Sequence, residues 1–220
     1  MLKEKLMLLV ASLCAGVIVM VLHELPKAIL YRRLKHRYGK EEDKKFENRI
    51  NPVHFVDPIG LIFCAIYGIG FSKPYYYRMK EKKWNQLLGI TGFLSLLVQF
   101  FIVVAILRFG FRIEFDYVIN THLTLWFSGG INTSIVNYPI FYEFLMYFFS
   151  SYAIISIGML ITNLFPLISS DMALLVAANQ PMKFVTLLRS DYVIKMVWMF
   201  LLLMGIMTSM SSAVFEIFMR

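Results

Sequence analysis

Three residues near the end of a long apolar run have the types and the spacing of a zinc-binding helix. In the HExxH pattern, two histidines four residues apart hold the metal from one helical face, and the glutamate after the first histidine activates the bound water. Here His23 and Glu24 supply the first two positions, and Lys27 stands where the second histidine is required. A protonated lysine is a poor zinc ligand, so the question is what this polar group does in an apolar helix.

The composition places these residues in a membrane protein. Of 220 residues, 59% are hydrophobic and 16% are charged, whereas soluble domains are about 45–50% apolar. The apolar runs lie at residues 6–22 (continuing as helix through Leu30), 58–71, 87–107, 140–168 and 193–219. A spanning helix needs about 20 apolar residues. The sequence therefore predicts one all-α membrane domain over residues 1–220, with four spanning helices.

The run at residues 58–71 is too short to cross a bilayer and lies between two basic segments. Residues 31–57 carry eight Lys or Arg, and residues 72–86 carry five. Because cytoplasmic loops collect basic residues, both segments are predicted to be cytoplasmic, with a re-entrant hydrophobic hairpin between them and the N-terminus outside. The net charge of +8 indicates contact with the anionic surface of a lipid bilayer and requires no nucleic acid.

The predicted outer loop, residues 108–139, contains one alternating pattern. In FRIEFDYVI, residues 111–119, apolar side chains alternate with mostly polar ones, and SGGIN, residues 128–132, has the composition of a turn. The period of two predicts a short strand-like segment near the membrane interface.

Three further segments follow HELPKA in order. They read NPVHFVDPIG at residues 51–60, GFSKP at 70–74 and NLFPLISSD at 163–171. Together, these motifs resemble the site-2 protease family, the intramembrane zinc metalloproteases, in its small bacterial form over residues 20–175. The loop motif matches the family spacing at Asn51, Pro52, His54, Asp57 and Gly60. The resemblance implies an integral protein of the bacterial cytoplasmic membrane.

The resemblance assigns His23 to the family's first metal ligand, Glu24 to its general base and Asp171 to its last metal ligand. Lys27 replaces the second histidine. Further departures from the family motifs lie at Phe93, Leu96, Ser169, Ser170 and Met172. If the resemblance holds, His23, Glu24, Lys27 and Asp171 converge, with TGFLS at residues 91–95 alongside.

The substitution of lysine for histidine changes the expected chemistry. Two ligands beside an ammonium leave zinc under-coordinated, so we expect no cofactor. We interpret the Lys27 ammonium as a substitute for the charge of the metal, which neutralises Glu24 and Asp171 inside the membrane. Glu24 is then a vestigial general base. The sequence predicts a pseudoprotease that binds a transmembrane helix of a partner or regulates a membrane partner.

Other interpretations stay open on the sequence alone. One is an active metalloprotease with altered ligands, in which His23 and Asp171 hold zinc. Another is a small-solute transporter subunit, which the basic loops and the lack of paired intramembrane polar repeats disfavour. The polar residues of α-helical ends can also serve only as interfacial caps. For His54 and Asp57, a role in shaping the turn before the hairpin is favoured over a chemical one.

Overall fold

The computed structural model describes residues 2–38, 51–73, 79, 81–111, 139–167 and 170–219, and the regular structure within them is helical. The predicted turn at residues 128–132 lies outside these ranges. So does the predicted strand-like segment at 111–119, apart from Phe111.

Three helices are long and apolar enough to cross a membrane. They are α1 (Leu2–Tyr38), α4 (Lys82–Ala105) with its π-helical continuation η2 (Ile106–Phe111), and α6 (Ile140–Leu164). The helices α8 (Pro181–Leu203) and α9 (Ile206–Met219) make a fourth candidate if they are counted as one broken span. The prediction of a helical membrane protein is therefore confirmed at this level.

The last apolar run, residues 193–219, is divided in the structure between the end of α8 and α9. The axes of α8 and α9 differ by 66°. Gly205 lies between them with φ of 72°, a left-handed conformation that ends a helix and that glycine adopts without a steric penalty. The hydrophobicity of the run indicates how many residues lie in an apolar environment, whereas the conformation of Gly205 determines the change in helix axis.

The short run at residues 58–71 folds back on itself. Asp57 caps α3 (Pro58–Tyr67) by accepting hydrogen bonds from the amides of Ile59 and Gly60, each at 2.9 Å. Gly68 ends α3 with φ of 67°, and the chain then returns without regular secondary structure.

Close backbone contact holds the two arms of this fold-back together. The amide of Lys73 donates to the carbonyl of Phe55 at 2.9 Å, so the two ends of the fold-back lie next to each other. A Cβ atom on Gly60 would overlap the carbonyl oxygen of Phe71, and one on Gly70 would overlap that of Gly60. The arms can approach this closely because neither glycine has a side chain.

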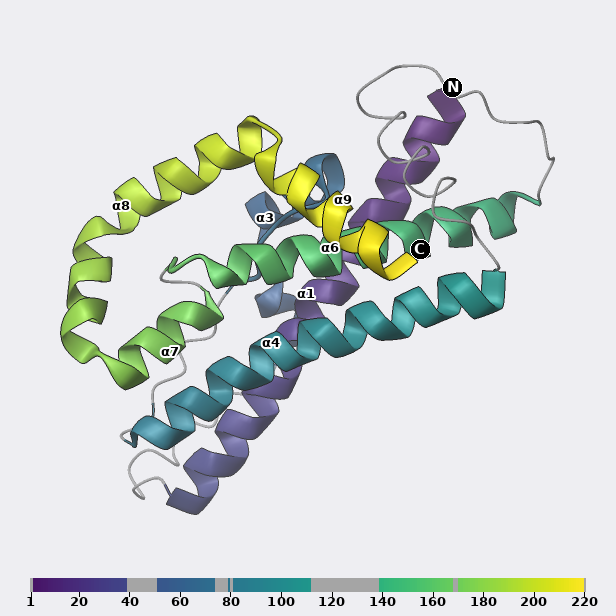
Figure 1. Cartoon of the computed structure of the whole chain (residues 1–220). Helices are drawn as coiled ribbons and strands as arrows, with labels where there is room; N and C mark the ends of the chain where they lie inside the picture. The colour runs from purple at the N-terminus through teal and green to yellow at the C-terminus, as the bar shows by residue number, and fades with distance from the viewer. Residues whose placement is uncertain are drawn as a thin grey trace.

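The long helices cross one another around a shared core (Figure 1). α1 packs against α3, α4 and α6, while α9 packs against α6. The short helix α7 (Asp171–Asn179) lies along α4. This arrangement brings the middle of α1, the first half of α4 and the start of α7 to one place.

α4 carries mostly apolar side chains on both its buried and its exposed faces. Its buried residues include Leu88, Gly92, Leu96, Gln99 and Val103. Its exposed apolar residues include Ile90, Leu94, Val98, Phe101 and Ile102. Apolar side chains on the exposed face of a helix are typical of a membrane span, because lipid covers that face.

Candidate functional site

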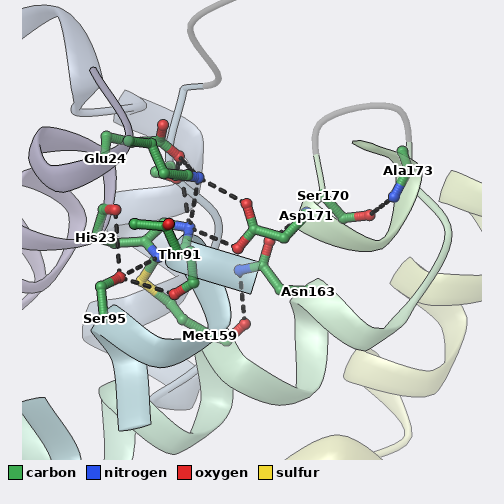
Figure 2. A network of polar contacts seen from close by, with 12 residues as sticks. His23, Glu24, Thr91, Ser95, Met159, Asn163, Ser170, Asp171 and Ala173 are labelled. Carbon is green, nitrogen blue, oxygen red and sulfur yellow. Dashed lines mark hydrogen bonds and ion pairs between the residues drawn. The ribbon is translucent and has the colours of Figure 1, made fainter. Parts of the chain in front are cut away.

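His23, Glu24 and Asp171 converge in a buried polar cluster (Figure 2), and the Lys27 ammonium contacts all three. It donates to Asp171 Oδ1 at 2.7 Å, to Glu24 Oε1 at 2.8 Å and to His23 Nε2 at 3.1 Å. All four residues are at most 2% exposed. The predicted convergence of His23, Glu24, Lys27 and Asp171 is thus confirmed.

The helical period of α1 places three of these residues together. His23 and Lys27 are one turn apart, and Glu24 is three residues before Lys27, so all three project toward α4 and α7. The same face is buried, whereas Leu22 and Ile29 on other faces of α1 are about 40% exposed. α1 therefore presents a polar patch to the protein interior and apolar side chains outward.

Asp171 is held in place by the end of α6. Asn163 Oδ1 accepts a hydrogen bond from the Asp171 amide at 3.0 Å, and Asn163 Nδ2 donates to the carbonyl of Met159 at 2.9 Å. Ser170 caps α7 by accepting from the amide of Ala173 at 3.2 Å. The asparagine and the aspartate of NLFPLISSD are thereby joined, which fixes the carboxylate at the helix start (Figure 2).

Two glycines on α4 make room for Asp171. A Cβ atom on Gly92 would overlap the Asp171 carboxylate. One on Gly89 would lie 3.1 Å from the Asp171 carbonyl oxygen. Because both positions lack a side chain, the start of α7 can approach the backbone of α4 closely.

The hydrogen bonds around His23 assign its tautomer. Its Nε2 accepts from Lys27, so the ring proton belongs on Nδ1, which lies 3.3 Å from Ser95 Oγ and donates to it. The Ser95 hydroxyl donates in turn to the Gly92 carbonyl at 2.7 Å. His23 is then neutral, and its ring is fixed from both sides.

The fold-back segment also reaches the cluster. The Ser72 hydroxyl donates to Glu24 Oε1 at 2.7 Å, and both side chains are buried. Glu24 Oε1 therefore accepts from Lys27 and from Ser72 together. The cluster ties α1 to α4, α7 and the return arm of the fold-back.

The charges of the cluster balance only in part. Counting only His23, Glu24, Lys27 and Asp171, with His23 neutral, one ammonium faces two carboxylates. Asp171 Oδ2 is buried and has no hydrogen-bond partner within the described chain, and it lies 3.3 Å from His23 Nε2. Lys27 is therefore the positive charge on which both carboxylates depend.

The arrangement does not fit the zinc ion that the family resemblance implies. The Lys27 nitrogen lies within hydrogen-bonding distance of His23, Glu24 and Asp171, and so takes up the donor atoms that would otherwise face a metal. Among the described residues, no group of three or more His, Cys, Asp or Glu side chains is arranged to hold a metal ion.

The residues of the loop motif lie elsewhere and shape the chain. Asn51 caps a 3-10 turn, η1 (Pro52–Phe55), by accepting from the Val53 amide, and Asp57 caps α3. His54 is exposed. These positions match the turn-forming role favoured by the sequence, and the motif does not contribute a side chain to the Lys27 cluster.

Sequence reasoning did not assign a role to four residues that support the cluster. They are Ser72, Gly92, Ser95 and Asn163. Ser95 and Gly92 are three residues apart in an apolar run, and a polar residue one turn from a glycine indicates a close helix contact in a membrane. Ser72 lies in GFSKP and Asn163 begins NLFPLISSD, so membership of these motifs was the feature of the sequence that could have indicated their role.

No protein-family model, curated protein or solved structure matches the chain.

Proposed function

We propose that this chain is a site-2-protease-like integral membrane protein without proteolytic activity, which binds a transmembrane helix of a partner protein. The observation that carries the proposal is the Lys27 ammonium, 2.7 to 3.1 Å from His23, Glu24 and Asp171. The ammonium supplies the positive charge that a metal would supply at the same place. The cluster then stabilises the fold and has no means of activating water.

The surroundings of Glu24 also argue against catalysis. A general base needs a carboxylate oxygen that can reach a water molecule held at the reacting centre. Glu24 is fully buried, and its Oε1 accepts from both Lys27 and Ser72. Its carboxylate is therefore used as a structural acceptor.

Binding a transmembrane helix, unlike cleaving it, does not require the metal of a site-2 protease. The cluster holds α1, α4, α7 and the fold-back in fixed positions relative to one another, and none of these contacts requires a metal. If a metal ligand is lost but the helices keep this arrangement, the surface that they form is retained. Partner recognition then needs shape and apolar contact rather than chemistry.

The proposal includes an arrangement in the membrane. The three long helices span it, α8 and α9 form a broken fourth span, and the fold-back enters and leaves on the cytoplasmic side. The N-terminus and the strand-like loop at residues 111–119 are outside, and the membrane is the bacterial cytoplasmic membrane. The hydrogen bond between Lys73 and Phe55 supports the re-entrant path, because it keeps both ends of the segment together.

Cleavage and binding can be separated in reconstituted vesicles. The wild-type chain and Glu24→Gln are each mixed with a panel of labelled single-span helices; cleavage is followed on gels and association by energy transfer. We expect no cleavage by either protein and saturable association of at least one helix with both. Cleavage that disappears in Glu24→Gln would establish a protease instead. Absence of saturable association with every helix would contradict the binding role.

A further inference from the structure

The end of α1 and the start of α4 carry a second group of side chains, about three helical turns along α1 from Lys27. The rings of Tyr38 and Trp84 stack here, with centroids 5.0 Å apart and planes inclined by 27°. Tyr38 is the last residue of α1, and Trp84 lies in the first turn of α4. The ring pair therefore joins two helix ends at one end of the bundle (Figure 1).

Each ring of the pair has a cation beside it. The Lys83 ammonium lies 4.7 Å from the centroid of the Trp84 ring, and the Arg37 guanidinium carbon lies 5.7 Å from that of Tyr38. Arg37 is exposed, and the Lys83 side chain is 65% exposed. Glu81 lies 3.0 Å from Lys83, but its side chain is 53% exposed, so this ion pair is weak.

Basic residues outnumber acidic ones at this end of the described chain. The last turn of α1 contains Lys35, His36 and Arg37, and α4 begins with Lys82 and Lys83 and has no acid in its first turn. Tryptophan and tyrosine beside lysine and arginine are the combination that membrane proteins place at the level of the lipid headgroups. The tyrosine ring is accessible, since Tyr38 is 49% exposed.

We propose that Arg37, Tyr38, Lys83 and Trp84 form a binding surface for anionic phospholipid headgroups. The two cations contact lipid phosphates, and the ring pair lies between the headgroups and the upper acyl chains. The cations alone would suit any soluble phosphate. The stacked rings favour lipid, because they offer an apolar surface directly beside the charges. This surface lies outside the Lys27 cluster, so it does not depend on the function proposed for that cluster.

Fluorescence quenching by brominated lipids tests the surface on the full chain. Trp126→Phe and Trp198→Phe leave Trp84 as the single tryptophan. This variant is reconstituted in zwitterionic vesicles that contain either brominated phosphatidylglycerol or brominated phosphatidylcholine. We expect stronger quenching by the anionic lipid. Arg37→Gln with Lys83→Gln should reduce the preference by about fivefold for each residue changed.

The matched control removes the same charge elsewhere. Lys183→Gln with Arg189→Gln changes two basic residues of α8 and should keep the preference. Equal quenching by both lipids, or a preference that survives the loss of Arg37 and Lys83, would overturn the proposal. Loss of the preference in inorganic phosphate, relative to chloride at equal ionic strength, would indicate a site for free phosphate and would also overturn it. Lipid retained in native mass spectra gives a second readout on the unmodified chain, with the same expected ranking.

Discussion

At the scale of single residues, Lys27 contributes more through its charge than through its packing. Its ammonium contacts Glu24 and Asp171 in a place from which water is excluded. Breaking such a group by removing one partner is costly, because the remaining charges stay buried without compensation. Replacing all of the charges together by neutral groups of similar size costs far less.

Lys27→Met should therefore destabilise the protein by about 3–5 kcal/mol, because two carboxylates lose their shared cation. The measurement is the free energy of unfolding in detergent micelles. The triple variant Lys27→Met, Glu24→Gln, Asp171→Asn should recover most of this loss. If Lys27→Met alone were as stable as the wild type, the ammonium would have no such role.

Asp171→Asn should be mild by comparison, with a loss of about 1 kcal/mol or less. The change leaves one ammonium and one carboxylate, which removes the formal excess of negative charge. The asparagine oxygen can still accept from Lys27, and its amide takes the place of the unpartnered Oδ2 near His23. The same unfolding measurement ranks it against Lys27→Met. A loss as large as that of Lys27→Met would contradict this account of the charge balance.

At the scale of elements, the contact between α4 and the start of α7 depends on small residues. Gly92 leaves room for the Asp171 carboxylate, and Ser95 on the next turn orients His23. This face of α4 therefore has two functions. It lets the start of α7 pack closely, and it orients the His23 ring of α1. Its opposite face exposes large apolar side chains such as Ile90 and Leu94.

Gly92→Ala should displace α7 from α4, because the added methyl group would overlap the Asp171 carboxylate. We expect a loss of about 1–3 kcal/mol, as for other overpacked positions. Gly110→Ala is the matched control, because within the described part of the chain a Cβ there meets only an Ile106 side-chain atom at 3.9 Å. Equal unfolding free energies for the two variants would argue against a tight α4–α7 contact.

The path of the fold-back can be tested by labelling from each side of the membrane. In a background without Cys14 and Cys64, single cysteines are introduced in place of His54 and Lys82, before and after the segment. Both should react with an impermeant thiol reagent from the same side, because the backbone bond from Lys73 to Phe55 returns the chain to its starting point. Reaction from opposite sides would exclude a re-entrant path.

At the scale of the whole molecule, the sequence predicted the meeting of distant motifs better than the course of the helices. His23 and Asp171 are far apart in the chain, and their meeting was predicted from the resemblance of HELPKA and NLFPLISSD to site-2 protease motifs. Pairing of polar residues in apolar surroundings favours the same meeting. The convergence was therefore predictable. The return of residues 58–71 was also predictable, because the run is too short to span and lies between basic segments.

Other features had weaker signals. The bend between α8 and α9 depends on the conformation of Gly205, and one glycine in an apolar run does not by itself indicate a break. The bond from Ser72 to Glu24 depends on where the fold-back ends in space. Neither is set by local spacing, because each arises from packing between segments distant in sequence.

The central claim, that the Lys27 ammonium takes the place of a metal, is tested most directly by elemental analysis. Wild-type protein and Lys27→His are purified side by side in buffer containing zinc, and the metal content per chain is measured by mass spectrometry. We expect no stoichiometric zinc in the wild type and a gain of zinc in Lys27→His, which restores HExxH. One zinc per wild-type chain, lost in His23→Ala or Asp171→Ala, would contradict the account.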